Sequence, residues 1–385
     1  MRIHKTALIF RYALLGISET FIQAQAGALA EFRPCYAGVQ RAKPSLPIAD
    51  DSIILMSGTS VADRISRRAF LSAGWAPGFY REISERNPVI LHAHFAPDAA
   101  AALPLASHFD IPLIATLHGY DVTSSEASLK RSHLGRLLLR RKHALFGRAK
   151  LFLCVSEFIR RKAIEAGYPE HKLRVHYIGV DRELFRPNSG ERERNLVLFV
   201  GRLIEQKGCR HLIEAMHLVQ QKRPDTRLVM IGEGADRAAF EALARERGIR
   251  CEFVGARPPE TVRNWLSRAQ VFCVPSVTGS NGAQEALGMV FAEAQAMGVP
   301  VVSFRNGGIS EVVRDGETGL LAAEGDQGAL ADHLLRYLSD EPFRYACSRR
   351  AVEWIGEQFD LRKQTRLLET FYREAEGMSV CAPAV

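Results

Sequence analysis

Two glutamates flank a glycine-containing turn at the start of an apolar stretch. The segment is Glu285-Ala-Leu-Gly-Met-Val-Phe-Ala-Glu293, and we expect its helix to begin at Gly288. The first N–H groups of a helix have no partner inside it and, with the helix dipole, they suit a phosphate. An ionised carboxylate only accepts hydrogen bonds, so it suits hydroxyl groups. Together these features predict a nucleotide-sugar site, although an ordinary amphipathic helix with two surface glutamates fits the same spacing.

A second candidate phosphate site follows the apolar run Leu196–Val200. There the chain reads Gly201-Arg202-Leu-Ile-Glu-Gln-Lys207-Gly208 before a helical pattern begins. Arg202 can direct two N–H groups at phosphate oxygens, and Lys207 can add a point charge. The Walker pattern is absent, so this is not a P-loop. The alternative interpretation is a surface turn with two solvated cations.

Further turns follow four more strand-like runs. The motifs are Gly232-Glu233-Gly234, Gly255-Ala-Arg257, Pro275-Ser276 and Asn306-Gly307-Gly308. Ligands of parallel sheets bind at the carboxyl ends of the strands. Five successive strand ends with tight turns are hard to explain by packing alone, and they predict one binding edge.

The elements that must position these turns alternate between short apolar runs and helical patterns. This is the βαβ signature of an α/β fold with parallel sheets. The expected strands are residues 7–10, 53–55, 89–92, 112–117, 151–155, 173–177, 196–200, 227–231, 252–254, 271–274 and 301–304. The expected helices are residues 96–109, 157–166, 211–221, 237–247, 260–268 and 288–297, with closing helices at 342–355 and 361–376.

A polar, aperiodic segment at residues 185–195 predicts a linker. We therefore expect two doubly wound domains, residues 1–187 and 188–385, that face each other across a cleft. The tail from residue 377 is expected to fray.

Composition narrows the class of protein. The chain has 385 residues, of which 47% are hydrophobic and 24% charged, and these values exclude a mainly disordered protein. The net charge of +8 favours anionic partners. The seven cysteines form no close pair and no zinc spacing, so reduced thiols of a cytoplasmic protein are expected. The sequence shows neither a signal peptide nor a stretch long enough to span a membrane.

Residues 130–150 form a basic, leucine-bearing segment with no acidic residue. It fits equally a solvated helix over the core and a basic amphipathic helix on an anionic membrane. The second interpretation would place the protein peripherally on the inner face of the plasma membrane. His92 and His94 lie at a strand end and are candidates for contact with acceptor or donor.

These motifs together resemble those of family 4 glycosyltransferases, the retaining enzymes with the GT-B fold. In the second half the matching segments are Gly201-Arg202 with Lys207-Gly208, Gly232-Glu233-Gly234, Val254-Gly255, Pro275-Ser276, the Glu285/Glu293 pair and Gly307-Gly308 with Glu311. In the first half they are Ser18-Glu-Thr-Phe-Ile22, His92-Ala-His-Phe-Ala-Pro-Asp98, His118-Gly-Tyr-Asp121, Val155-Ser156-Glu157 and Gly179-Val-Asp181. The resemblance covers nearly the whole chain and is strongest to enzymes of bacterial exopolysaccharide and colanic-acid assembly.

The resemblance implies a role for each matching residue. Glu285 would hold hydroxyls of the donor sugar near the reacting carbon, and Glu293 would hold the ribose hydroxyls. Arg202 and Lys207 would hold the diphosphate, and His118 would lie beside the donor sugar. The remaining donor-binding residues would be Gly201, Arg257 near the base, and the turn Leu287, Gly288, Met289 and Val290. Two departures from the family pattern are Ala286, where a glycine is frequent, and a first turn with only Gly16.

The residue inventory agrees with sugar transfer. Arg202, Lys207 and the helix start at Gly288 can stabilise charge on a leaving diphosphate. The chain has no Asp-x-Asp cluster, so we expect neither a metal nor another cofactor. The resemblance favours displacement on one face of the sugar, with the leaving phosphate accepting the proton of the acceptor. The expected partners are a nucleotide sugar and a glycan or lipid-linked glycan acceptor, but not nucleic acid.

Three alternatives remain open at this point. A GT-B phosphorylase would release sugar phosphate, and a non-catalytic module would bind a nucleotide sugar without turnover. A Rossmann oxidoreductase is disfavoured because no Gly-x-Gly-x-x-Gly motif follows the first strand.

Overall fold

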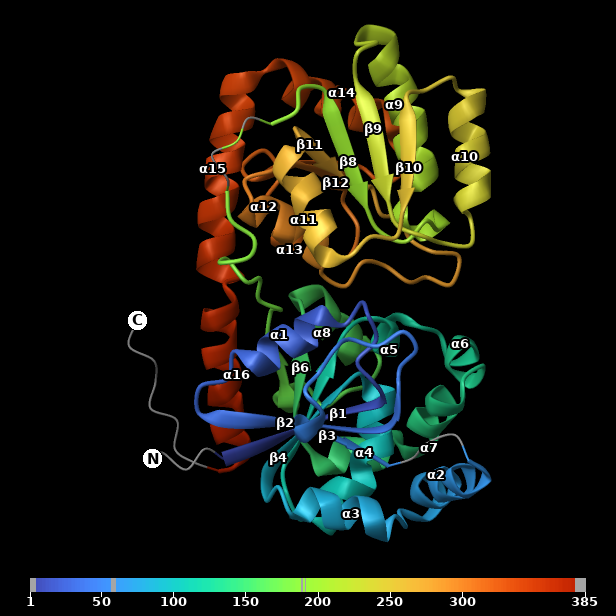
Figure 1. The fold of residues 1–385 in the computed structure, drawn as a ribbon, viewed down its shortest axis with the longest axis vertical. Helices are drawn as coiled ribbons and strands as arrows, with labels where there is room; N and C mark the ends of the chain where they lie inside the picture. Colours follow the sequence, from blue (N-terminus) through green and yellow to red (C-terminus); the bar gives the residue numbers. More distant parts are fainter. Residues whose placement is uncertain (1–4, 57–59, 188–189, 191, 378–385) are drawn as a thin grey trace. The chain divides into compact units, whose positions relative to one another are not determined.

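The computed structural model describes residues 5–56, 60–187, 190 and 192–377, and it divides into two units (Figure 1). The first unit combines the chain up to Gly179 with the chain from Leu361 onward, and the second runs from Val180 to Asp360. The expected division into residues 1–187 and 188–385 therefore differs at both ends of the second unit. The frayed tail expected from residue 377 falls almost wholly outside the described residues.

The first unit is built on a parallel sheet of seven strands in the order β3-β2-β1-β4-β5-β6-β7. Its strands are β1 (Lys5–Leu14), β2 (Phe32–Arg41), β3 (Ile53–Leu55), β4 (Pro88–His94), β5 (Leu113–Leu117), β6 (Ala149–Cys154) and β7 (Leu173–Val175). The order reverses between β1 and β4. At such a switch point the loops that leave neighbouring strands diverge to opposite faces and leave room for a ligand.

Strand β2 was not predicted. It pairs with β1 along nearly its full length, although Pro34 and Gly38 interrupt its apolar pattern. A β-carbon at Gly38 would lie 2.9 Å from the carbonyl oxygen of Arg11, so the glycine allows β2 to approach β1. Gly38, which makes this strand hard to recognise in the sequence, is therefore required by the packing of β2 against β1.

Helices cover both faces of the first sheet. They are α1 (Thr20–Gly27), α2 (Val61–Ala73), α3 (Pro77–Ser84), α4 (Ala96–His108), α5 (Tyr120–Thr123), α6 (Glu126–Lys130), α7 (His133–Arg148), α8 (Glu157–Glu165) and α16 (Leu361–Ala375). Ala7 and Ile9 pack in one cluster with Leu368 and Tyr372 of α16. Because side chains alternate along a strand, Leu8 and Phe10 face the opposite side, where α4 contacts β1, β4 and β5.

The closing helix α16 therefore belongs to the first unit. The sequence had suggested that it belongs to the second. Its apolar stripe buries Leu368 and Tyr372 against the first sheet. An amphipathic pattern predicts that a helix is covered on one face, but it does not identify the sheet that covers it.

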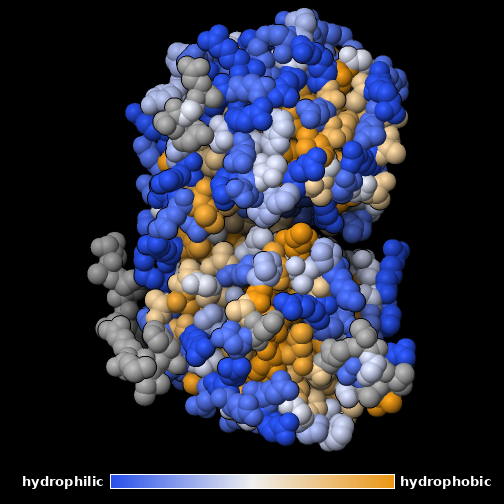
Figure 2. All heavy atoms as spheres, viewed as in Figure 1, coloured by the Kyte–Doolittle hydropathy of each residue, from blue (hydrophilic) through white to orange (hydrophobic). Residues whose placement is uncertain are grey.

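The second unit has a parallel sheet of six strands in the order β10-β9-β8-β11-β12-β13. Its strands are β8 (Leu196–Val200), β9 (Arg227–Ile231), β10 (Cys251–Gly255), β11 (Val271–Cys273), β12 (Val301–Phe304) and β13 (Gly319–Ala322). Its helices are α9 (Cys209–Lys222), α10 (Arg237–Glu246), α11 (Pro259–Arg268), α12 (Met289–Ala296), α13 (Ile309–Val312), α14 (Gln327–Ser339) and α15 (Glu341–Gln358). Every predicted strand of this half is confirmed, and only β13 was missed. On the face drawn in Figure 2, hydrophobic residues show among the strands of each sheet and the surroundings are mostly hydrophilic.

Two residues of the segment predicted as a linker, Arg192 and Glu193, bind groups of the second unit. The guanidinium of Arg192 donates to the carbonyl oxygens of Ala269 at 3.0 Å and Met297 at 2.8 Å. Glu193 accepts hydrogen bonds from Arg227 and Arg268, both at 2.7–2.8 Å. These two charged residues therefore bind backbone and side-chain groups of the second unit.

Three further observations bear on the expectations from sequence. All six cysteines in the described residues are free, and Cys381 lies outside them. The first turn follows β1 through Leu15, which has a φ of 39°, and Gly16, whose N–H donates to Glu19 at 3.0 Å. Within the described residues, no helix combines the length and the apolar character needed to cross a bilayer.

Candidate active site

The predicted donor residues of the second unit gather at the switch point of its sheet. Lys207 follows β8 and Ser276 follows β11, and these strands are adjacent where the strand order reverses. Glu285 comes from the long loop between β11 and α12. The carboxyl ends of β8 and β11 therefore bring together residues that are up to 78 positions apart in the chain.

Lys207, Ser276 and Glu285 form the centre of this site. Lys207 Nζ donates to Glu285 Oε2 at 2.5 Å, and Ser276 Oγ donates to the same oxygen at 3.1 Å. The side chains of Glu285 and Lys207 are 16% and 19% exposed. Glu285 Oε1 has no partner among the described residues. Glu285 and Lys207 thus present one free carboxylate oxygen beside a partly buried ammonium group.

Two opposing effects set the charge of Glu285. Burial would raise the pKa of its carboxyl group, but the charge of Lys207 and the hydrogen bonds from Lys207 and Ser276, with a smaller effect of Arg202, lower it. The net result is a pKa below the ordinary value, so the carboxylate is ionised at neutral pH. A buried, oriented negative charge is the feature that electrostatic stabilisation of a developing positive centre requires.

The backbone of Glu285 is fixed by the turn after β12. Its N–H donates to Asn306 Oδ1 at 2.9 Å, and its carbonyl accepts from the N–H of Gly308 at 2.8 Å. Gly307 has a φ of +54°, and a β-carbon there would lie 2.0 Å from the carbonyl oxygen of Glu285. Only glycine fits this contact, which explains why the turn reads Asn306-Gly307-Gly308.

A further carboxylate, Glu324, holds this turn in place. It accepts from Asn306 Nδ2 at 2.8 Å and from the N–H of Thr278 at 2.6 Å. Glu324 is a positioning residue that sequence reasoning missed, because it lies after β13 and belongs to none of the recognised motifs.

The start of α12 matches the predicted phosphate site. Gly288 precedes the helix with a φ of 83°, and the N–H groups of Met289 and Val290 have no acceptor among the described residues. Leu287 is buried and anchors the turn. Free N–H groups at a helix start can bind an anion, provided that the approach is open.

Glu293 lies one turn further along α12 and differs from Glu285 in having no countercharge. Its carboxylate has no hydrogen-bond or ion-pair partner in the part of the chain that the structure describes. Burial alone raises its pKa to about 7. A carboxylate without a partner in a half-buried position can accept hydroxyl groups of a ligand.

The remaining predicted donor residues lie at the same edge but make fewer contacts. Arg202 is exposed and close enough to Glu285 to lower its pKa. Gly201 packs against Gly232, where a β-carbon on Gly232 would meet the carbonyl oxygen of Gly201 at 1.8 Å. Arg257 follows β10 and is exposed, and within the part of the chain that the structure describes it makes no hydrogen bond or ion pair with Lys207, Ser276 or Glu285.

A separate cluster surrounds His118 at the switch point of the first unit. His94 Nδ1 and His118 Nε2 share a hydrogen bond of 3.0 Å, and the two rings stack with centroids 5.3 Å apart. Burial first, and then neighbouring cationic and imidazole groups, keep the pKa of both histidines well below the ordinary value. The cluster therefore offers neutral imidazoles, which can donate or accept hydrogen bonds but carry no charge.

His92 is not at the open side of this cluster. Its two ring nitrogens bond Tyr372 Oη and Thr116 Oγ1, both at 2.7 Å, and the residue is fully buried. Sequence reasoning had offered His92 as a candidate ligand contact, whereas the structure places it as a link between β4, β5 and α16.

Arg11 is a residue of this cluster that sequence reasoning missed. It forms ion pairs with Glu19 and Asp98, donates to the carbonyl oxygen of His94 at 3.2 Å, and lies 4.3 Å from the ring centroid of Phe95. Asp121 accepts from the N–H groups of Ala96 and Gly119 and so holds the turns after β4 and β5 together.

Comparison with known proteins identifies the chain. Residues 181–354 match the family described as "Glycosyl transferases group 1", and residues 44–184 match "Glycosyltransferase Family 4". The chain is 30% identical over 283 residues to the colanic acid biosynthesis glycosyltransferase WcaL of Salmonella typhimurium, which covers 72% of this chain and 68% of that protein. This chain belongs to glycosyltransferase family 4.

A second relative of this family 4 chain is the amylovoran biosynthesis glycosyltransferase AmsK of Erwinia amylovora. The two are 31% identical over 262 residues, which is 66% of this chain and 64% of AmsK. The chain thus spans just under two thirds of the length of AmsK, and also of WcaL from Escherichia coli at 66%. The named relatives are transferases, and they do not favour a phosphorylase or a non-catalytic binding module.

Solved structures give the fold of this glycosyltransferase. HepE from Anabaena, in complex with UDP and glucose, aligns with a TM-score of 0.75 at 18% identity over 96% of this chain and all of HepE. Sucrose-phosphate synthase from Thermosynechococcus elongatus aligns with a TM-score of 0.77 at 21% identity over 98% of this chain and all of that one. The predicted GT-B fold is confirmed.

Proposed function

We propose that this chain transfers a sugar from a nucleoside diphosphate donor to a glycan acceptor with retention of the anomeric configuration. The observation that carries the proposal is the trio of Lys207, Ser276 and Glu285 at the switch point of the second sheet. The buried ionised carboxylate with its free oxygen suits the hydroxyl groups of a sugar donor. The neighbouring ammonium group and the open helix start suit its diphosphate. HepE, which has the same fold, has been solved in complex with UDP and glucose.

Each group has a part in the proposed reaction. The bond from the anomeric carbon to the phosphate oxygen breaks, and the acceptor oxygen bonds to the same face of that carbon. The acceptor's proton passes to an oxygen of the leaving phosphate. Lys207, Arg202 and the N–H groups of Met289 and Val290 stabilise the charge left on the diphosphate, and Glu285 orients the sugar and faces the developing positive charge. Glu293 accepts the ribose hydroxyls, and Arg257 lies toward the base.

His118 contributes hydrogen bonds and not charge. Its buried ring is neutral, and its neighbour His94 fixes it by a shared hydrogen bond. We propose that the imidazole bonds a hydroxyl of the donor sugar. A cationic ring would repel the oxocarbenium-like centre, so the depressed pKa suits this position.

The test is turnover across a panel of UDP-, GDP- and ADP-sugars with the full chain. We expect release of a nucleoside diphosphate from at least one donor, with the hydrolysed sugar first appearing in the donor's own anomeric form. Binding of a donor without any turnover, in the presence of glycan acceptors, would instead support a binding module. Inversion of the anomeric centre would contradict the retaining mechanism.

We further propose that the acceptor is a lipid-linked glycan and that the first unit binds an anionic membrane surface. Structure separates the basic segment into two groups. Arg141, Lys142 and Arg148 donate to backbone carbonyl groups and so hold α7 to its neighbours. Arg136 and Arg140 are exposed on α7, and the only backbone bond of this pair among the described residues joins Arg136 to the nearby carbonyl oxygen of Lys130 at 2.9 Å.

The neighbouring helix α2 extends this basic surface. A hollow of about 560 Å³ lies between α2 and α7, and its lining includes Arg68, Leu71 and Arg140. Ile65 of α2 and the adjacent Trp75 are 64% and 63% exposed. Exposed cations beside an exposed tryptophan and isoleucine suit the headgroup region of an anionic bilayer.

Co-sedimentation with anionic and neutral liposomes tests this surface. The double change Arg136→Glu and Arg140→Glu should abolish binding to anionic liposomes, because each cation near such a surface contributes about 1 kcal/mol. Binding by the native chain should also weaken with salt, since screening acts beyond roughly 10 Å at 0.1 M. A matched control reverses Arg245 and Arg350, which are exposed on helices of the second unit. Equal sedimentation of all three proteins would show that α7 only covers the core.

A further inference from the structure

A cavity of the second unit lies at the edge of the sheet opposite the donor residues. It has a volume of about 650 Å³, and its lining includes Gln270 and Gly298. Gln270 immediately precedes β11, and Gly298 lies shortly before β12, whereas the donor residues follow these strands. Because both strands are parallel, this cavity and the donor residues lie at opposite ends of the same sheet.

The lining of this cavity carries more positive than negative side chains. Four arginines contribute, from the segment that enters the unit and from α15: Arg192, Arg194, Arg344 and Arg349. Figure 1 shows that the chain leading to this segment, residues 180–187, runs beside α15. Two carboxylates, Glu341 and Glu353, also line the cavity, and both residues are exposed.

The arginines differ in what they already bind. Arg192 donates to backbone carbonyl groups, and Arg344 donates to the carbonyl oxygen of Tyr337 at 2.6 Å and forms an ion pair of 3.9 Å with Glu341. Arg194 and Arg349 are exposed and have no hydrogen-bond partner among the described residues. Two anchored guanidiniums thus form the inner wall, and two unpartnered ones lie at the mouth.

These cations are close enough to repel one another. Burial lowers the pKa of Arg192 to about 10, with a further contribution from the charge of Arg344. Burial also lowers the pKa of Arg344, which Glu341 opposes and which Arg194 and Arg223 reinforce. Like charges that lower one another's pKa are relieved by an anion placed between them.

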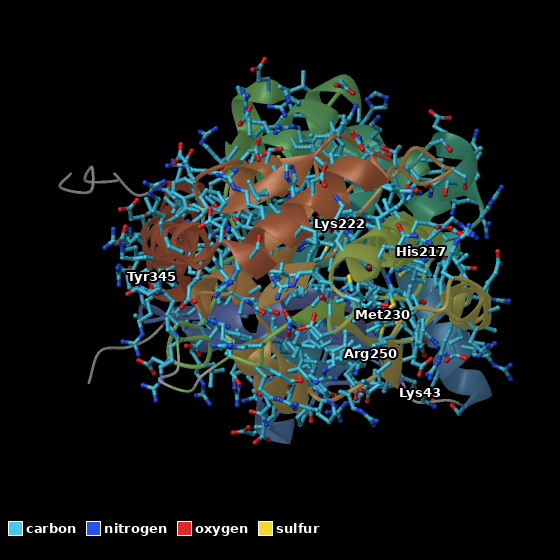
Figure 3. All side chains as sticks on the ribbon, turned by 90° about the horizontal axis from the view of Figure 1, so that it is seen from above. Lys43, His217, Lys222, Met230, Arg250 and Tyr345 are labelled. Atoms are coloured by element: carbon cyan, nitrogen blue, oxygen red, sulfur yellow. The ribbon has the colours of Figure 1, made fainter. Side chains whose placement is uncertain are left out.

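The other wall is one face of α15, which adds an aromatic ring and an apolar side chain to the lining. Tyr345, Arg349 and Val352 recur at helical spacing on one face of α15, and Tyr345 is 70% exposed. Figure 3 shows the position of Tyr345 at the outer side of the unit. Ser348 adds a hydroxyl group to the same face. A flat ring against Tyr345 would bring an attached phosphate to the arginines.

We propose that this cavity binds a phosphorylated small molecule with a flat ring, at a site separate from the donor site. The phosphate bonds Arg194 and Arg349 at the mouth and faces the charges of Arg192 and Arg344, and the ring stacks on Tyr345. Guanidinium groups suit phosphate because they donate paired hydrogen bonds in a fixed plane. The inference does not depend on the proposed transfer reaction.

Calorimetry with AMP and with inorganic phosphate tests the site on the full chain. The parent protein for the test carries Arg202→Ala and Lys207→Ala, which disable phosphate binding at the donor site. Adding Arg194→Ala and Arg349→Ala should weaken AMP binding by about tenfold or more, because two charge-assisted hydrogen bonds are lost. Arg350→Ala, an exposed neighbour on α15 that does not line the cavity, is the matched control.

A third variant separates the ring from the phosphate. Tyr345→Leu should weaken AMP binding but leave binding of inorganic phosphate unchanged. Thermal unfolding of each variant checks that the fold survives, which is expected because Arg194, Tyr345 and Arg349 are exposed. The proposal is overturned if the Arg194/Arg349 variant binds AMP as tightly as its parent, or if the Arg202/Lys207 changes alone abolish all binding.

Discussion

In both units the candidate functional residues lie where the strand order of the sheet reverses. The two groups of residues differ in charge. In the first unit, β4 and β5 carry His94 and His118 at the edge where the strand order reverses beside β1. In the second, β8 and β11 carry Lys207 and Ser276, which hold Glu285. One site consists of neutral rings in contact, and the other of an ionised carboxylate in contact with an ammonium group.

The difference shows how burial shifts the pKa of a group with and without a neighbouring opposite charge. Burial disfavours the charged form of every one of these groups. At Glu285 the charge of Lys207 outweighs burial, so the carboxylate stays ionised. At His118 the neighbouring groups are imidazoles and the cation Arg11, which add to burial, so the ring stays neutral. The same sheet edge therefore supplies a fixed charge in one unit and uncharged hydrogen-bonding groups in the other.

The largest expected effect is on stability in acid, and it tests the neutral site. Two buried histidines beside this site are His92, whose ring stacks on His94, and His176, whose Nε2 shares a hydrogen bond with the carbonyl group of Gln364. Burial lowers the pKa of His92 to about 3 and that of His176 to about 4, so the unfolded chain binds more protons than the folded chain below pH 6.5. The free energy of unfolding should then fall as pH drops from about 6.5 toward 4, by up to about 1.4 kcal/mol for each unit of pKa shift in a histidine. Urea unfolding of the full chain between pH 7.5 and 5 measures this.

Glu293 has the opposite effect on the free energy of unfolding in the same pH range. Its folded pKa of about 7 lies above that of an unfolded glutamate, so its protonation stabilises the fold as pH falls. The comparison is therefore made in a Glu293→Gln background, with and without His92→Gln. A smaller loss of stability in the double variant is expected. A stability that does not change between pH 7 and 5 in the Glu293→Gln protein would show that the histidines are not buried as neutral groups.

The next effect tests the charged site directly. Glu285→Gln keeps the shape of the side chain but removes its charge, and we expect turnover to fall by about two to four orders of magnitude. The fold should survive, because backbone bonds to Asn306 and Gly308 hold the loop. Glu317→Gln, on the exposed turn before β13, is the isosteric control. Full turnover by a folded Glu285→Gln protein would remove the carboxylate from the mechanism.

The cations beside Glu285 should have a smaller effect. Lys207→Ala and Arg202→Ala should each remove about 2–4 kcal/mol of transition-state stabilisation and should also weaken binding of the nucleoside diphosphate. Only Lys207→Ala should also raise the pKa of Glu285 strongly, because Lys207 contacts it directly. Calorimetry with the diphosphate and the pH dependence of turnover separate the two roles. Unchanged diphosphate affinity in both variants would place the diphosphate elsewhere.

The charged site was largely predictable from sequence, and the neutral site was not. Arg202, Lys207 and Glu285 lie in short motifs whose residues follow strands, so local spacing predicted their common edge. Glu324 supports that edge through Asn306, but no local motif marks it. Long-range pairs of this kind follow from the folded positions of β12 and β13 and leave no periodic signal.

In the first unit the decisive contacts join distant parts of the chain. His92 bonds Tyr372, which lies 280 residues away on α16. The sequence predicted both the strand and the helix but assigned the helix to the other domain. Pro34 and Gly38 concealed β2, although the backbone of Gly38 must approach β1 closely. For the elements that were found, the local pattern predicted whether each is a helix or a strand. The sheet against which each helix packs depended on which apolar faces come into contact in the fold.

The smallest expected effect is that of metal removal, and it sharpens the contrast between the sites. In the second unit, Lys207 and Arg202 already supply positive charge beside the proposed diphosphate. Among the described residues, no three side chains of the His, Cys, Asp and Glu types form a group suited to a metal ion. We therefore expect turnover to persist in excess EDTA, because side-chain cations take the role that a hard cation has in other transferases. Abolition by EDTA with rescue by Mg²⁺ or Mn²⁺ would show that these two residues are insufficient, and the charge of the second site would then come from outside the chain.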